Sequence, residues 1–154
     1  MVTHITESLL STLGSSLQGT LHTDTVMKTL YATDASAYRE MPLGVAIPET
    51  QEDIEKIIRF ADKHAIPLIP RTAGTSLAGQ VVGKALVVDV SKFFNRILEV
   101  NAAESYVWVE PGVVRDVLNV ELKKQGLFFG PETSTANRAM IGGMVGNNSC
   151  GSNS

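Results

Sequence analysis

Residues 67–80 read Pro67-Leu68-Ile69-Pro70-Arg71-Thr72-Ala73-Gly74-Thr75-Ser76-Leu77-Ala78-Gly79-Gln80. A short apolar run ends at Pro70, and small residues and hydroxyls follow it. Such a loop can bring several backbone N–H groups close to one anion, because no bulky side chain stands in the way. The pattern predicts a strand followed by a loop that holds a pyrophosphate. A tight crossover between two strands, with no ligand, is the alternative.

A second stretch of the same character lies near the end of the sequence. It reads Ile141-Gly142-Gly143-Met144-Val145-Gly146-Asn147-Asn148-Ser149-Cys150-Gly151. Two such loops suggest one dinucleotide held from two sides. Alternatively, the glycines let a helix pack closely. The amides and hydroxyl at residues 147–149 favour hydrogen bonds to a ligand over close packing.

Two standard phosphate-binding motifs are excluded. A P-loop needs Gly-Lys followed by Ser or Thr, but Ala85 follows Gly83 and Lys84. The Rossmann fingerprint G-x-G-x-x-G occurs nowhere in the chain. If the first loop binds phosphate, it does so in a different architecture.

Composition narrows the function further. The 154 residues include 13 Lys and Arg against 16 Asp and Glu, a net charge of −3, which disfavours nucleic acid or an anionic membrane as the main partner. His4, His22 and His64 lack metal-ligand spacing, so no metal site is expected, and Ser76 and Ser149 have no readable triad partners. No secretory signal or membrane-spanning run is visible, and a cytoplasmic protein is expected.

The expected elements form an α+β fold, in which helices cover a mixed sheet. Helices are predicted at residues 6–17, from Thr50 through an apolar face at 54, 57, 58, 61 and 65, and from Val114 to a stop at Gly126. Strands are predicted at 66–70, 85–90 and 127–129, an edge-type piece at 43–47, and a hairpin at 97–100 and 106–110. Trp108 is expected in the core. Because residues 151–154 follow a glycine-rich loop with no closing element, we expect a fragment of a longer protein.

Four segments in order resemble the flavin-dependent oxidases and dehydrogenases of the vanillyl-alcohol-oxidase (PCMH) type. They are residues 45–50, 70–80, 109–112 and 141–151, and the resemblance covers roughly residues 31–154. The similarity is greatest to the D-2-hydroxyacid branch, which includes D-lactate dehydrogenase, D-2-hydroxyglutarate dehydrogenase and the flavin subunit of glycolate oxidase. It implies an FAD-binding domain of two small α/β subdomains, at about 31–105 and 106–154, after a helical lead-in at 1–30.

The resemblance also implies the cofactor contacts. The first loop would wrap the FAD pyrophosphate, residues 131–135 would run beside the flavin ring and ribityl chain, and the second stretch would approach the dinucleotide. The residues implied are Arg71, Thr72, Ala73, Gly74, Thr75, Ser76, Gly79, Gln80, Pro131, Glu132, Thr133, Ser134, Thr135, Gly142, Gly143, Asn148, Ser149 and Gly151. Many relatives carry glycine at the place of Ala73, where a methyl group requires a negative φ.

The function implied is oxidation of a 2-hydroxy acid with hydride transfer to FAD. Some relatives attach FAD through a histidine where Thr75 stands, so non-covalent FAD is expected. The catalytic base cannot be assigned to any residue of this chain, and the resemblance leaves open the electron-transfer partner and a peripheral association with the inner membrane. A non-redox nucleotide-binding module, or a domain in which FAD is structural, is the alternative.

Overall fold

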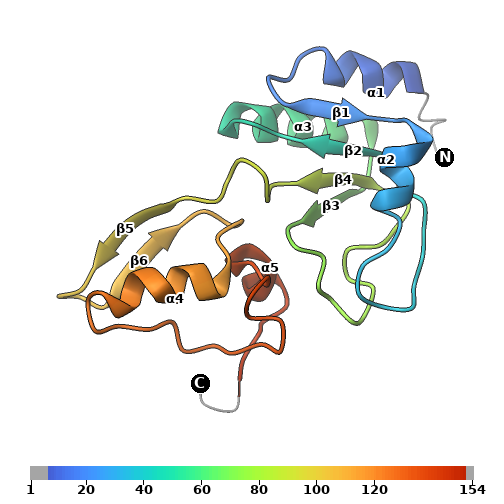
Figure 1. Ribbon diagram of the computed structural model, residues 1–154. Helices are drawn as coiled ribbons and strands as arrows, with labels where there is room; N and C mark the ends of the chain where they lie inside the picture. The colour runs from blue at the N-terminus through green and yellow to red at the C-terminus, as the bar shows by residue number, and fades with distance from the viewer. Residues whose placement is uncertain (1–6, 152–154) are drawn as a thin grey trace. The chain divides into compact units, whose positions relative to one another are not determined.

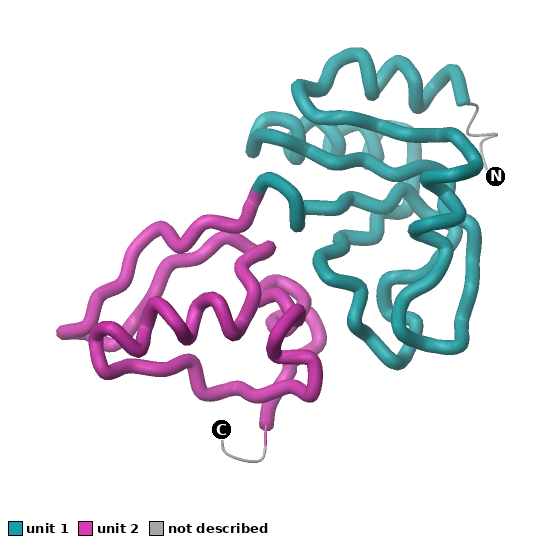
Figure 2. The backbone as a smooth tube through the Cα atoms, in the orientation of Figure 1, with its two compact units in different colours: residues 1–93 teal, residues 94–154 magenta. Residues whose placement is uncertain are grey.

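The computed structural model describes residues 7–151, which form two compact units that divide between Phe93 and Phe94 (Figures 1 and 2). Each unit contains strands and helices of its own, as the α+β expectation requires. The hairpin of the sequence prediction lies wholly in the second unit. The subdomain boundaries of the complete FAD-binding domain stay a prediction.

The first unit is built on a four-stranded mixed sheet in the order β1-β2-β4-β3 (Figure 1). β1 is antiparallel to β2, and the other neighbours are parallel. The elements in chain order are α1 (Glu7–Gly14), β1 (Thr20–His22), α2 (Thr25–Leu30), β2 (Gly44–Ile47), α3 (Gln51–His64), β3 (Leu68–Arg71) and β4 (Leu86–Asp89). α1 is shorter than the helix predicted at residues 6–17, whose first residue lies outside the described residues. Neither β1 nor α2 was predicted.

Alternation along the strands places apolar residues on both faces of this sheet. One face packs under α1 and α3, and its core comprises Leu10, Leu13, Ala46, Ile57, Ala61, Ile66, Leu86 and Val88. Val45 and Val87 point to the other face and are buried as well. Buried on both faces, β4 fits the continuous apolar run of its sequence, as predicted.

A strand forms within the predicted range 43–47, but the prediction that it lies at the edge of the sheet is wrong. β2 is an interior strand, since it pairs with β1 on one side and β4 on the other. Pro42 and Pro48 lie just outside β2, so neither removes a hydrogen bond from its ladder.

α3 begins directly after Thr50, as the helix predicted from that residue requires, and the Thr50 side chain caps it. The Thr50 hydroxyl accepts a hydrogen bond from the Asp53 amide at 3.2 Å. The predicted apolar face holds at Ile57 and Ala61, which are buried, but Ile58 is 52% exposed and lies off that face. The apolar stripe is therefore narrower than the sequence indicated.

The second unit pairs a hairpin with two helices. β5 (Ile97–Asn101) and β6 (Tyr106–Val109) are antiparallel, and α4 (Arg115–Lys123) and α5 (Ile141–Gly146) follow. Its separate core comprises Val113, Leu118, Leu122, Ala139, Ile141 and Met144, with Val107 and Val109 of β6 packed against it.

Two predictions for this unit are wrong. Trp108 is 63% exposed, because alternation turns Val107 and Val109 inward and Trp108 outward. Residues 127–129 form no strand; instead the Asn119 side chain holds them, accepting from the Phe129 amide at 2.6 Å. No helix among residues 7–151 is long and apolar enough to cross a membrane.

Candidate functional site

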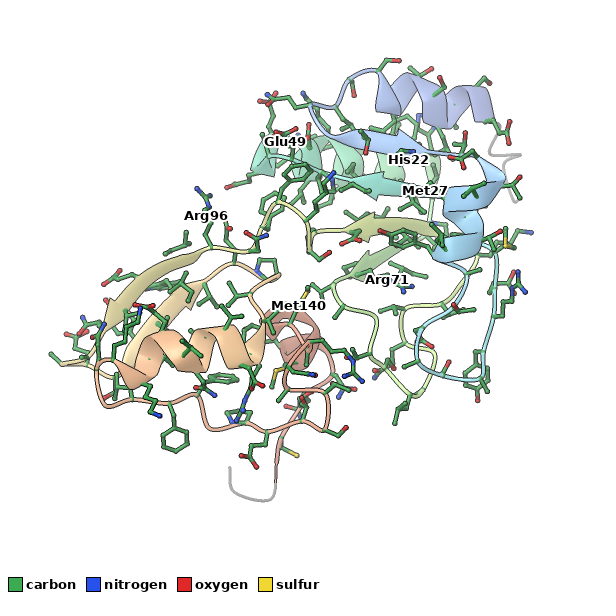
Figure 3. The ribbon with its side chains drawn as sticks, viewed as in Figure 1. His22, Met27, Glu49, Arg71, Arg96 and Met140 are labelled. Carbon is green, nitrogen blue, oxygen red and sulfur yellow. The ribbon has the colours of Figure 1, made fainter. Side chains whose placement is uncertain are left out.

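The first candidate loop begins at Arg71, the last residue of β3 (Figure 3). Gly74 has a φ of +65° and Gly79 a φ of +70°, conformations that side-chain-bearing residues rarely adopt. Ala73 is not among the described residues with positive φ, so the expectation for its methyl group is confirmed. The Ser76 hydroxyl donates to the Gln80 side chain at 2.9 Å and accepts from the Ala78 amide at 3.1 Å.

The amides of this loop are the most informative feature of the site. Among the described residues, none of the six consecutive N–H groups from Thr72 to Leu77 donates a hydrogen bond to a protein acceptor. Residues 72–76 are nevertheless half-buried. These N–H groups are therefore open to a ligand that carries acceptor oxygens, as an anion does. We call the run from Thr72 to Leu77 the amide cradle.

The Arg71 side chain lies against Gly74 and binds the segment that precedes β2. Its Nη1 donates to the Thr33 carbonyl at 2.9 Å and more weakly to the Tyr31 carbonyl at 3.4 Å. Its guanidinium lies over the Tyr31 ring, 5.0 Å from the centroid. The segment that precedes β2 is thereby fastened to the start of the loop.

Tyr31 is held in turn by the buried Asp89, at the end of β4. The Tyr31 hydroxyl donates to Asp89 Oδ2 at 2.6 Å, while Asp89 Oδ1 accepts from the Ser91 amide at 2.8 Å. Burial, followed by the hydrogen bond to Asp89, raises the pKa of Tyr31 well above its ordinary value. Sequence reasoning missed this group, although a charged residue that ends an apolar strand requires a partner.

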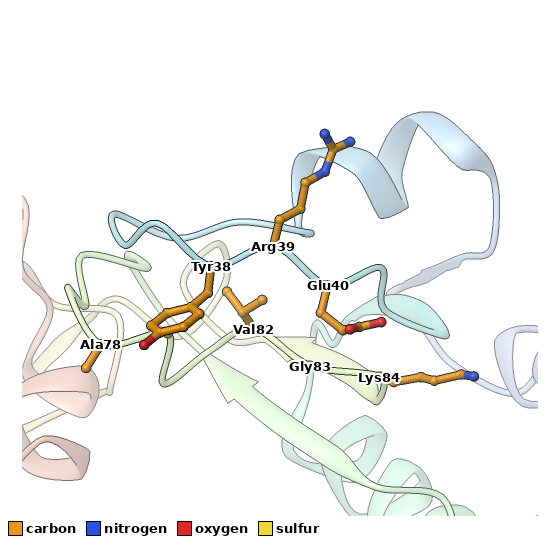
Figure 4. A pocket seen from close by; sticks show the side chains of 8 residues that line it. Tyr38, Arg39, Glu40, Ala78, Val82, Gly83 and Lys84 are labelled. Atoms are coloured by element: carbon orange, nitrogen blue, oxygen red, sulfur yellow. The ribbon is translucent and has the colours of Figure 1, made fainter.

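An open pocket borders the far end of the loop (Figure 4). Tyr38 packs beside Gly79, where a Cβ would come 2.7 Å from the tyrosine Cδ2. Tyr38 is itself 64% exposed. Of the predicted cofactor contacts only Gly79 lines this pocket, so it is distinct from the amide cradle.

The segment 131–135 belongs to the second unit and is anchored by Arg115. The Arg115 Nε donates to the Pro131 carbonyl at 3.2 Å, and its Nη2 lies 3.8 Å from Glu132. The Thr133 hydroxyl oxygen is buried and has no hydrogen-bond partner among the described residues. Thr135 accepts two turn hydrogen bonds through its carbonyl.

The second glycine-rich stretch is a helix over most of its length, not a loop. Ile141–Gly146 forms α5, and a Cβ on Gly142 would lie 2.5 Å from Pro111 Cβ. The close-packing alternative therefore accounts for Gly142. Asn148 ends the helix with a φ of +49°, and Asn147 Nδ2 donates to the Ser149 hydroxyl at 3.0 Å.

Three of the predicted segments meet within the second unit. Pro111 touches Gly142, and a Cβ on Gly151 would lie 2.8 Å from the Glu132 backbone. Glu110 is buried; a hydrogen bond from the Arg96 side chain at 2.7 Å is the main cause that lowers its pKa, and burial opposes it. Residues 110–111, 131–132 and 142–151 thus share one neighbourhood. The first loop lies in the other unit, and convergence of the two on one ligand stays a prediction.

Comparison with known proteins places this geometry in context. A model of the FAD binding domain family matches residues 42–154. The D-2-hydroxyglutarate dehydrogenase of Pseudomonas putida is 38% identical over 143 residues, which cover 91% of this chain and 14% of that protein. The mitochondrial D-lactate dehydrogenase [cytochrome] of Kluyveromyces lactis is 33% identical over 136 residues, covering 86% of this chain and 23% of that protein. The chain thus spans a small part of these relatives.

A solved structure of an alkyldihydroxyacetonephosphate synthase shares the fold, with a TM-score of 0.81 at 18% identity over 95% of this chain and 30% of that one. The half-buried amide cradle, the clustered second-unit segments and the family match agree with one another. The chain belongs to the FAD binding domain family, with FAD as its cofactor.

Proposed function

We propose that the loop of residues 71–80 holds FAD by its diphosphate, as part of an enzyme that oxidises a 2-hydroxy acid. The observation that carries the proposal is the run of six N–H groups, Thr72 to Leu77, that have no acceptor among the described residues. Two phosphate groups offer many acceptor oxygens at close range. Hydrogen bonds to a charged group contribute about 1.5–3 kcal/mol each.

The residues of both units fit the cofactor. In the first unit the cradle presents main-chain donors, and a net charge of −3 for the chain does not oppose binding by amides. In the second unit the orphaned Thr133 hydroxyl offers a polar partner to a ribityl or ring atom. The proposed contacts are residues 71–76, 79, 80, 131–135, 143, 148, 149 and 151, with Gly142 serving to seat α5 against Pro111.

The attachment is proposed to be non-covalent. Threonine stands at position 75, where relatives that bond the flavin carry histidine, and its alcohol is a far weaker nucleophile than an imidazole at neutral pH. The cofactor is then retained by non-covalent contacts alone.

The relatives named D-2-hydroxyglutarate dehydrogenase and D-lactate dehydrogenase support a 2-hydroxy acid as the substrate of the complete protein. When bound, FAD supplies the redox chemistry, accepting two electrons from such a substrate. The described residues bind and orient the cofactor. A cytoplasmic location is proposed from the sequence.

Gly74→Ala in the complete protein tests the cradle. We expect the FAD dissociation constant to rise about tenfold, the loss of roughly one charge-assisted hydrogen bond. A methyl group there meets both a φ of +65° and the Arg71 guanidinium, 2.5 Å from Nη2. The measurement is a titration of the FAD-free protein with FAD, followed by flavin fluorescence.

Gly126→Ala is the matched control. Gly126 has a φ of +72°, and a Cβ at this position would have nothing within 4 Å, so the substitution imposes similar backbone strain away from the cradle. We expect it to lower the melting temperature and leave FAD affinity intact. Equal FAD affinity in the two variants would remove the first loop from the site.

A further inference from the structure

The contacts of Arg71 set it apart from the residues of the cradle. Its Nη1 is committed to the carbonyls of Tyr31 and Thr33, at 3.4 and 2.9 Å. Turning Nη1 toward a phosphate would break both hydrogen bonds. It would also remove the cation from the Tyr31 ring, over which it now lies at 5.0 Å.

The surroundings hold Arg71 where it is. Tyr31 cannot swing with it, because its hydroxyl is bound to the buried Asp89 at 2.6 Å. Arg71 and Asp89 are also paired residues of neighbouring strands, and the Val90 amide donates to the Arg71 carbonyl at 3.1 Å. Backbone and side chain of Arg71 are therefore both fixed before any ligand is present.

The same guanidinium also lies against Gly74. A Cβ on Gly74 would lie 2.5 Å from Nη2 and 3.0 Å from Nε of Arg71, so the guanidinium fills the space under this glycine. Two residues beyond Thr33, the segment returns to the loop, where the Ala35 amide donates to the Gly74 carbonyl at 3.2 Å. Arg71 thus braces Gly74 directly and through the 31–35 segment.

We propose that Arg71 is a positioning residue, which holds the amide cradle in its binding shape by tying it to residues 31–35 without contacting a phosphate. The inference rests on the proposed FAD site and gives one of its residues a different task. A cradle held in shape before binding loses less conformational freedom when the diphosphate arrives. The bond from Ala35 to Gly74 reports on this shape even when FAD is absent.

The experiment compares Arg71→Met and Arg71→Lys with the wild-type complete protein. Hydrogen exchange at the Ala35 amide is measured without FAD, and the FAD dissociation constant is then measured by titration. We expect both variants to exchange Ala35 about tenfold faster and to bind FAD about tenfold more weakly, since each loses the two carbonyl contacts. Lysine keeps the charge but lacks the flat, multiply donating group.

Two controls separate the loss of the Arg71 contacts from a loss of charge and from unfolding. Arg59→Met removes the same charge from the exposed side of α3 and should change neither quantity. The Val90 amide reports on the strand end and should keep its protection, which shows that the variants fold.

Rescue of FAD affinity by lysine, or weakened binding with unchanged Ala35 exchange, would mean that Arg71 acts on the phosphate itself and would overturn the proposal. Failure of the wild-type protein to bind FAD would refute the proposed function instead, while the Ala35 exchange would still decide whether Arg71 braces the loop.

Discussion

Single residues with several backbone partners organise the first unit, and Asp53 is the clearest case. It is fully buried, and its carboxylate accepts from the amides of Gln18, Gly19 and Glu49 at 2.9–3.0 Å. Burial alone would raise the pKa of Asp53, but these hydrogen bonds outweigh it and the pKa lies below its ordinary value. One side chain therefore ties the residue before the Thr50 cap of α3 to the turn before β1.

Asp53→Asn should destabilise the protein by roughly 3 kcal/mol at neutral pH, because an amide NH₂ would face N–H donors and leave them unpaired. The depressed folded-state pKa also sets the pH dependence. The contribution of Asp53 is complete above the unfolded-state value of about 3.9 and is lost as the pH falls through the lower folded-state value. Urea denaturation at pH 7 and near pH 3 measures this; a difference between variant and wild type that does not narrow in acid would contradict it.

The sequence revealed only the local half of this arrangement. Thr50 and Asp53 are three positions apart, so a cap was readable from spacing. Gln18 and Gly19 are 35 and 34 positions from Asp53, and no local pattern links them. Tyr31 and Asp89 are 58 positions apart, and no local pattern linked them to each other or to Arg71.

At the scale of elements, three helices end in the same way. α3, α4 and α5 are each followed by a residue with positive φ, namely Ala65, Gly126 and Asn148. In each case the next amide reaches back to a carbonyl five residues earlier, as from Ile66 to Ala61. This is the Schellman arrangement, and it favours glycine at the left-handed position.

Ala65→Gly should therefore stabilise the protein by about 1 kcal/mol, since alanine is strained at a φ of +51° and glycine is not. Urea denaturation gives the change in the free energy of unfolding. Ala103→Gly, at an exposed position outside the left-handed region, should be neutral or destabilising. Equal effects of the two substitutions would count against strain at Ala65.

These helix ends show where pattern reading succeeds. The prediction of a helix stop at Gly126 is confirmed, because glycine is the residue type that usually takes the left-handed conformation found there. Ala65 was read as part of the apolar face, and Asn148 as a ligand group, because neither residue type announces a left-handed turn. The left-handed backbone conformation of Asn148 by itself favours asparagine at this position, independently of any contact with a ligand.

At the scale of the whole molecule, two separate cores support two compact units. The core under α1 and α3 and the core around α4 have no residue in common. The sequence predicted the α+β class and most strands correctly. It could not locate the division at residues 93 and 94, because no linker composition marks it.

Leu118→Ala should open a cavity in the second core and cost about 2–5 kcal/mol there. Hydrogen exchange should accelerate in β6 more than in β4, because Leu118 packs only in the second core. Ile57→Ala should give the reverse order. Uniform acceleration of both strands in both variants would show that the units unfold as one.

Because the cradle binds through six backbone amides, it tolerates many amino-acid substitutions. Every residue type but one carries the same main-chain donor, so side chains at 72–77 other than Gly74, where even a methyl group clashes with Arg71, can vary in identity provided that they stay small. Proline is the exception, since it would delete a donor outright. Because the main chain binds the ligand, the identities of the side chains say little about what the loop binds. Selection must instead preserve the backbone conformation of the loop.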